Sequence, residues 1–100
     1  MIRHVVMWKF KEMGEGKTKA ENLDIVRDKL FALIPIIPEL KKMEIGKDIL
    51  HTDMSYDLVL ITEFENLDDL HTYAVHPEHV KVVNYVKNVV ESRVVLDCEI

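Results

Sequence analysis

The sequence predicts an α+β domain in which strand, helix and strand follow one another twice. Three observations predict this class. Apolar residues alternate with a period of two in several short segments, two stretches between these segments have helical spacing, and glycine or proline separates the pieces. The chain has 100 residues, which form one domain over residues 1–100 with a thin hydrophobic core.

The first half of the chain predicts one strand and one helix before a second strand. Alternation predicts a strand over residues 2–10, and a loop with two glycines follows it. A helix should begin at Thr18, which has capping-box spacing to Glu21, and end before Pro35. The second strand is expected within residues 39–50, with a kink or bulge at Gly46. The apolar stripe of the helix comprises Leu23, Val26, Leu30, Leu33 and Ile34.

The second half repeats this order. Residues 56–65 predict a strand that is apolar on both faces at its centre. Asn66 is a suitable N-cap for a helix that runs to about Val75, and Pro77 suits the first position of a further helix. A last strand is expected over residues 93–100. The inward residues of the helix after Pro77 are predicted to be Val80, Val83, Val86 and Val90.

This element order is that of the ferredoxin-like βαββαβ fold. Right-handed crossovers place both helical segments on one face of an antiparallel sheet, whose first and third strands are central. The other face is also apolar, and exposing it would forgo about 1.5–3 kcal/mol per fully buried large side chain. We therefore predict a homodimer packed sheet to sheet. The expected interface residues are Val5, Met7, Val59, Ile61 and Val95.

Charge and cysteine content narrow the function classes. The net charge of −5 argues against nucleic acid as a partner, because no basic face competes with the acidic residues. The single cysteine, Cys98, indicates a reducing compartment, so a cytoplasmic location is expected. The apolar start of the chain is broken by charged residues, so we expect neither a signal peptide nor a membrane span.

The segment "YAVHPEH", Tyr73 to His79, carries the clearest chemical signal. A histidine near its ordinary pKa is a competent base at neutral pH, and a tyrosine hydroxyl can stabilise an oxyanion. Tyr73 and His79 lie on either side of Pro77, so both can converge above the sheet near His4, which gives three candidate catalytic residues. An apolar pocket with a few polar groups is typical of a small-molecule site. Its predicted walls are Val6, Trp8, Leu58, His76, Val83 and Val86.

Structural interpretations of the same residues remain open. His76 can be a helix cap, Tyr73 a core residue with its hydroxyl at the rim, and His79 a residue that closes the helix junction. His76 and His79 have metal-ligand spacing, but Pro77 lies between them and Glu78 is the one evident third ligand. Zinc needs three or four converging donors, so no metal site is expected here.

Four segments together carry a family resemblance, which covers nearly the whole chain. They are "RHVVMWKFKE", "IPIIPELKKMEIGKDI", "YDLVLITEFENLDDLHTYAVHPEHVKVV" and "VVESRVVLDCEI". The chain resembles the stress-responsive A/B barrel (Dabb) family, and the Y-x-x-H-P-x-H segment with the early His4 is the most specific part. The resemblance implies a dimeric α+β barrel. A plant member closes a linear polyketide by aldol condensation with a histidine and a tyrosine of this segment. By position, the resemblance implies His79 as general base and Tyr73 as hydrogen-bond donor.

Two positions depart from that plant cyclase, which has a histidine where Leu58 stands and a tyrosine where Leu30 stands. A polyketide substrate is therefore not carried over to this chain. The resemblance implies a small apolar carbonyl compound as ligand, acid–base chemistry like that of a cyclase or isomerase, and no cofactor. A non-catalytic stress-responsive dimer is an alternative. Haem or flavin oxidation, known in distant dimeric α+β barrels, is another. Some plant relatives hold a magnesium ion through backbone carbonyls, and the matching stretch here is Ile34 to Leu40.

Overall fold

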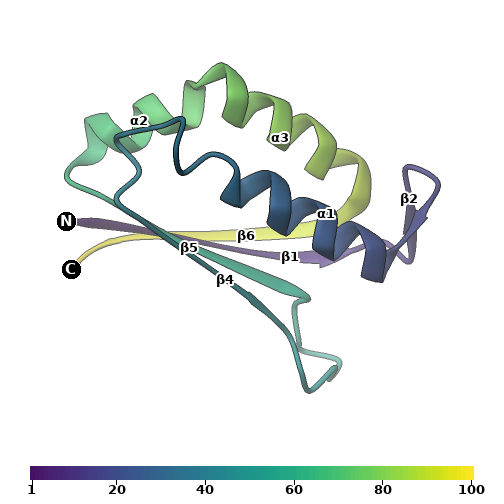
Figure 1. The fold of residues 1–100 in the computed structure, drawn as a ribbon. Coiled ribbons are helices and arrows are strands. Elements are labelled where there is room, and N and C mark those ends of the chain that lie inside the picture. Colours follow the sequence, from purple (N-terminus) through teal and green to yellow (C-terminus); the bar gives the residue numbers. More distant parts are fainter.

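The computed structural model describes residues 1–100 as a four-stranded antiparallel sheet with three helices on one face (Figure 1). The strand order is β4-β5-β1-β6, so the first and third long strands are central and the predicted ferredoxin-like fold is confirmed. A short ribbon of β2 and β3 follows β1. The elements are β1 (Ile2–Phe10), β2 (Met13–Gly14), β3 (Lys17–Thr18), α1 (Lys19–Phe31), β4 (Lys42–Lys47), β5 (Leu58–Phe64), α2 (Leu67–Val75), α3 (Pro77–Val89) and β6 (Val90–Glu99).

Side-chain caps fix the starts of all three helices. Thr18 and Glu21 form the predicted capping box at α1. The Asn66 side chain accepts a hydrogen bond of 2.9 Å from the backbone N–H of Asp69 at the start of α2. At α3 the cap is His76, whose Nδ1 accepts from the backbone N–H of Glu78 at 3.1 Å, with Pro77 in the first turn. The predicted helix starts are therefore confirmed.

The end of α1 differs from the prediction. The helix stops at Phe31, and residues 32–40 continue as turns. Leu33, Ile37 and Leu40 from this segment are buried in the core, whereas Ile34 is exposed. Because the chain turns after Phe31, Leu33, Ile37 and Leu40 can all face the sheet. A helix that continued to Pro35 would contain Leu33 alone of these three residues, and so would not by itself place them on one side.

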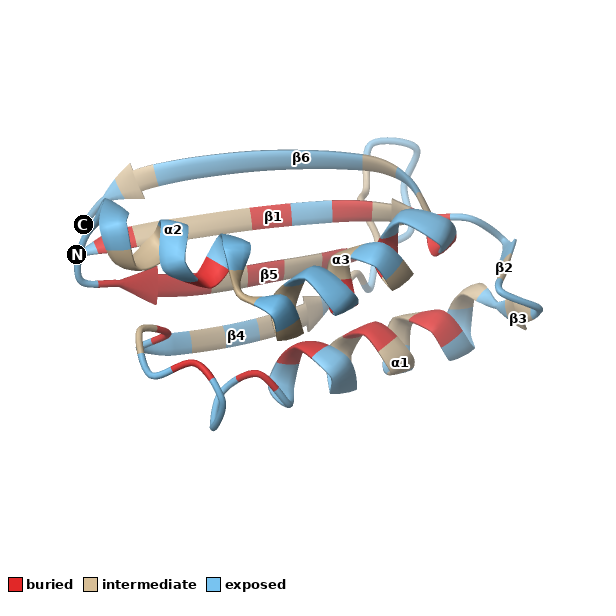
Figure 2. Cartoon of the chain, turned by 90° about the horizontal axis from the view of Figure 1, so that it is seen from above, coloured by how far each residue is buried: buried red, intermediate tan, exposed pale blue.

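The core lies between the helices and the helix-facing side of the sheet (Figure 2). Its members alternate along β1 and β5 as predicted. The phase predicted for α3 is wrong in part, because Val82, Val86 and Val89 are buried while Val80 is 41% exposed. The buried stripe of α3 follows helical spacings of four and three residues, and Val80 lies on the opposite side of the helix from this stripe. The buried strand residues are Ile2, Val6, Trp8, Phe10, Leu58, Leu60, Thr62, Glu63 and Phe64.

The register of β6 corrects one predicted interface residue. Val95 pairs with Val6, and residues directly opposite each other share a face, so Val95 lies on the helix-facing side of the sheet. Val94 pairs with Met7 and Leu96 pairs with Val5, which places these two on the outer face instead. The strand does alternate, with Val94 and Leu96 on one face and Val95 on the other, but both faces carry apolar residues, so the sequence did not specify which face meets the helices.

Gly46 is a second correction. β4 and β5 pair without a register shift, and Gly46 lies opposite Val59, so the predicted kink or bulge is absent. A Cβ atom at this position would lie 3.3 Å from Cγ1 of Val59. The glycine therefore permits a close approach between neighbouring strands. None of the helices is both long and apolar enough to cross a membrane.

Candidate active site

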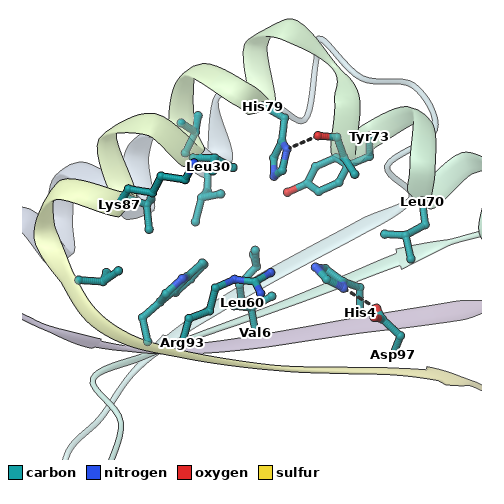
Figure 3. Close-up of a pocket in the computed structure, with 16 residues that line it drawn as sticks. His4, Val6, Leu30, Leu60, Leu70, Tyr73, His79, Lys87, Arg93 and Asp97 are labelled. Carbon is teal, nitrogen blue, oxygen red and sulfur yellow. Dashed lines mark hydrogen bonds and ion pairs between the residues drawn. The ribbon is translucent and has the colours of Figure 1, made fainter.

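A cavity of about 520 Å³ lies between the helices and the sheet, and most of its lining is apolar (Figure 3). Side chains from β1, α2, α3 and β6 contribute most of it. Its lining residues are His4, Val6, Trp8, Leu30, Leu60, Leu70, Tyr73, Ala74, His79, Val82, Val83, Val86, Lys87, Val90, Arg93 and Asp97. A mostly apolar hollow of this size has the general features of small-molecule sites in proteins.

The structure brings most of the predicted site residues to this cavity. His4, Tyr73 and His79 all line it. So do Val6, Trp8, Val83 and Val86, which were predicted as its walls.

Two predicted wall residues lie elsewhere. Leu58 is buried in the core opposite Trp8, and Leu60, two residues further along β5, lines the cavity in its place. His76 does not line the cavity either, because its ring nitrogen caps α3 as the structural interpretation proposed. Both residues should be removed from the predicted pocket.

His79 is held in one tautomer. Its Nδ1 lies 3.1 Å from the carbonyl oxygen of Ala74. A carbonyl can only accept, so Nδ1 carries the proton and donates, and in the neutral ring Nε2 keeps its lone pair. Burial lowers the pKa of His79, and the charges of His4 and Arg93 lower it further, while the Ala74 hydrogen bond acts in the opposite direction. His79 is therefore neutral at neutral pH, with a free basic nitrogen.

Tyr73 supplies the matching donor. Its side chain is 1% exposed, and its ring centroid lies 5.1 Å from that of Phe64 and 4.2 Å from that of His79. The hydroxyl points toward the cavity beside the His79 ring (Figure 3) and has no hydrogen-bond partner in the protein. Burial raises the pKa of Tyr73, so the phenol remains protonated. A buried hydroxyl without a partner costs about 1–3 kcal/mol, and a ligand oxygen would recover that cost.

A second unpartnered donor belongs to the same cavity. The indole N–H of Trp8 is buried and has no acceptor within the protein. Buried polar atoms without partners are uncommon in folded proteins and require an explanation. Both residues with such an atom, Trp8 and Tyr73, line this cavity.

His4 faces the cavity from the sheet, opposite the helices that carry Tyr73 and His79 (Figure 3). Its Nδ1 is hydrogen-bonded to a carboxylate oxygen of Asp97, the residue directly opposite it on β6. The carboxylate accepts, so Nδ1 of His4 is protonated and the ring orientation is fixed. The cavity thus has a histidine on each of two opposing walls.

The sequence interpretation missed Asp97, Arg93 and Lys87, all of which line the cavity. The sequence contained a pattern that could have indicated Arg93 and Asp97 as cavity residues. Arg93 and Asp97 are four residues apart on a strand, so they share a face, and that face is the one that carries His4.

Metal-ligating side chains do not gather in the structure, since no group of three or more His, Cys, Asp or Glu residues converges within residues 1–100. The stretch from Ile34 to Leu40 lies in turns, where Leu40 N–H donates to the Ile37 carbonyl at 3.1 Å. A cation in this stretch would depend on backbone carbonyls, and the chemistry proposed below does not involve one.

Comparison with known proteins shows which family the chain belongs to. Olivetolic acid cyclase from Cannabis sativa is 24% identical over 98 residues, which cover 96% of this chain and 93% of that protein. A dimeric protein of unknown function with a ferredoxin-like fold from Bacteroides fragilis is 29% identical, with a TM-score of 0.78 over 99% of this chain and 95% of that one. Hydroxynitrile lyase from Passiflora edulis is 19% identical, with a TM-score of 0.83 over 99% of this chain and 92% of that one, and shares the fold. The model of the stress responsive A/B barrel domain matches residues 2–100, and the chain therefore belongs to that family.

Proposed function

We propose that the cavity binds a small, mostly apolar carbonyl compound and that His79 acts on it as a general base. One observation carries the proposal. The Tyr73 hydroxyl, buried and without a partner, lies beside a histidine whose Nδ1 is occupied by the Ala74 carbonyl. An unused donor next to a free basic nitrogen is the arrangement needed to polarise a carbonyl and remove a proton from the adjacent carbon.

The proposed reaction begins with a proton transfer. Nε2 of His79 takes a proton from the carbon next to the ligand carbonyl, and the C–H electron pair moves to form an enolate. The Tyr73 hydroxyl donates a hydrogen bond to the enolate oxygen, where the negative charge develops. Return of the proton to carbon, or attack of the enolate on a second carbonyl of the same ligand, completes an isomerisation or a cyclisation.

His4 is proposed to assist from the opposite wall. Its Nδ1 is occupied by the Asp97 carboxylate, so Nε2 of His4 is the nitrogen that remains for a hydrogen bond or proton exchange with a ligand oxygen at the sheet side of the cavity. The apolar lining excludes water and strengthens each of these polar interactions.

The similar proteins support catalysis in this fold, since one is named as a cyclase and another as a lyase. The cavity of this chain has its own lining. Leu30 lies at the cavity and Leu58 in the core, so both positions where the resemblance placed polar residues in the cyclase are apolar here. We therefore propose general-base chemistry on a substrate that is more apolar than the polyketide of that cyclase.

We also propose that the protein is a homodimer through the outer face of the sheet. Val5, Met7, Val59 and Ile61 lie on that face and are incompletely buried, and Val94 and Leu96 extend it onto β6. The loop between β4 and β5 projects from the sheet on the side away from the helices (Figure 1), and its Ile49, Leu50 and Met54 are exposed. Similar structures are described as dimeric. A second copy of the chain would cover this apolar surface.

The catalytic proposal is tested with 2-nonanone in D2O, a ketone whose α-protons exchange very slowly unaided. The wild-type protein should accelerate loss of the α-proton NMR signals. His79→Ala should reduce the rate by a factor of about 10²–10⁴, the usual contribution of a general base. His71→Ala, which removes an exposed histidine on α2, is the matched control and should leave the rate unchanged. Equal rates for the wild type and His79→Ala would refute the assigned role.

A further inference from the structure

Two cationic side chains line the same cavity (Figure 3). Lys87 comes from the last turn of α3, and Arg93 comes from β6. Neither forms an ion pair with a carboxylate, although acidic residues outnumber basic ones by 18 to 13 in the chain. Both residues are exposed and lack a carboxylate partner, so both are available to an anionic group of a ligand in the cavity.

The strand register gives the backbone separation between Arg93 and the His4–Asp97 pair. Arg93 pairs with Trp8, and Asp97 pairs with His4. Four residues along a strand span about 13 Å. The backbone positions of Arg93 and of the His4–Asp97 pair are therefore separated by the length of a chain of roughly eight to ten carbons, and the Arg93 side chain extends from its strand into the cavity (Figure 3).

Structural roles account for Lys87 more easily than for Arg93. A lysine in the last turn of a helix interacts favourably with the helix dipole, which gives Lys87 a role without a ligand. Arg93 is on a strand and has no such role. Its charge also acts inside the cavity, since it contributes to lowering the pKa of His79. A guanidinium presents paired N–H donors that match a carboxylate, and an apolar surrounding strengthens that pairing.

We propose that Arg93, assisted by Lys87, forms an anion subsite, and that the ligand is an amphipathic acid with a carboxylate at one end of an apolar chain. The carboxylate binds at Arg93, the chain lies along the valines of α3, and the reacting carbonyl reaches His79 and Tyr73. This inference rests on the proposed function, because it names the substrate class of the same cavity. A net charge of −5 disfavours anions over most of the surface, so an anionic ligand needs such a local cationic site.

Octanoate and 1-octanol are the probes, because they share an apolar chain and differ in the charged group. Titration followed by calorimetry and by amide NMR shifts of the cavity residues gives both affinities. The wild type should bind octanoate at least tenfold more tightly than 1-octanol. Arg93→Gln should weaken octanoate binding about tenfold, the effect of losing a charge-assisted hydrogen-bonded pair, and leave 1-octanol binding unchanged. Lys87→Gln should weaken octanoate binding about threefold, as expected of an exposed charge.

Lys41→Gln is the matched control, because Lys41 is exposed, has no carboxylate partner and does not line the cavity. It changes the net charge equally and should not alter either affinity. Thermal melting shows that each variant is folded. If 1-octanol binds as tightly as octanoate, or if Arg93→Gln leaves octanoate binding unchanged, the anion subsite is wrong while the apolar pocket stands. If neither probe shifts the cavity residues, the proposed small-molecule function and the subsite both fail.

Discussion

The imidazole of His79 and the phenol of Tyr73 lie 4.2 Å apart, centroid to centroid, with their planes inclined by 41°. They belong to different helices, and the break at Pro77 brings them together. The Ala74 carbonyl holds the histidine ring by Nδ1, so the nitrogen that remains is the one available to a ligand. The relative position of these two rings is the basis of the chemistry proposed for this chain.

Tyr73→Phe should separate stability from function. The hydroxyl is buried without a partner, so its removal takes away a cost of about 1–3 kcal/mol and leaves the packing against Phe64 intact. We expect the midpoint of thermal unfolding to stay the same or rise by several degrees. Proton exchange of 2-nonanone should fall by about ten- to a hundredfold, because the enolate loses its donor. A lowered melting temperature would show that the hydroxyl has a structural partner, and would contradict this assignment.

The pH dependence of stability should identify the protonation state of His79. The folded protein lowers the pKa of this group, so the folded state prefers the neutral ring. Below the unfolded pKa, about 6.5, the unfolded chain takes up a proton that the folded state resists. The contribution of His79 to stability is therefore fully present above pH 6.5 and is lost as the pH falls through 6.5 toward the lower folded pKa. Urea unfolding of the wild type and His79→Gln across pH 5–8 measures this as a widening difference at low pH.

The matched variant for that titration is His71→Gln, since His71 is an exposed residue of α2. Its stability should follow that of the wild type at every pH. A constant difference between wild type and His79→Gln over the whole range would mean that the pKa of His79 is the same in the folded and unfolded states.

Leu96→Glu should dissociate the proposed dimer. Leu96 is 63% exposed in the single chain and lies on the outer face of the sheet, so a charge there does not disturb the monomer core but would be buried at a sheet-to-sheet interface. Val95→Glu, one residue earlier, puts the same charge on the helix-facing side, where the side chain is 48% exposed. Sedimentation at micromolar concentration should give monomer mass for the first variant and dimer mass for the second. Dimer mass for both would place the interface elsewhere.

Asn22→Ala should destabilise the fold well away from the cavity. Asn22 is fully buried, donates to the carbonyl of Gly14 at 3.0 Å and accepts from the Tyr85 hydroxyl at 2.6 Å. The truncation leaves both partners unsatisfied, so we expect a loss of about 2–4 kcal/mol in the free energy of unfolding. Tyr85→Phe removes the hydroxyl itself and should cost about 1 kcal/mol. Denaturant unfolding of the two variants gives the comparison, and equal losses would mean that the hydrogen bond to Gly14 contributes nothing beyond the one from Tyr85.

The sequence predicted the parts of this fold that depend on local chemistry. The helix starts marked by Thr18, Asn66 and Pro77 were recognisable because hydroxyl, amide and proline groups act on the backbone within a few residues of themselves. The side of the sheet faced by Val95 was not, because consecutive apolar residues on an edge strand leave its register to pairing with β1. The role of Gly46 was not predictable from the sequence for the same reason, because it depends on the residue that pairs with it on the neighbouring strand, Val59.

In the candidate site too, the residues found from the sequence were those marked by local signals, and the residues missed depend on long-range pairing. His4, Tyr73 and His79 were found from residue type and from the proline break, which are local signals. The Asp97 partner of His4 and the place of Arg93 at the cavity depend on a pairing of residues about ninety positions apart. Leu58 was assigned to the cavity on its strand face alone, and the position of the helices above decided that Leu60 takes that place.

The first and last residues of the chain meet at one corner of the sheet (Figure 1), where the Ile100 N–H donates to the Met1 carbonyl at 3.1 Å. A short flexible linker would join them without disturbing the ladder between β1 and β6. New ends could then be opened in the exposed loop between β4 and β5, which lies at the other end of the sheet from the two termini (Figure 1). The molecule is thus suited to circular permutation, with affinity tags leaving from the opposite end of the sheet.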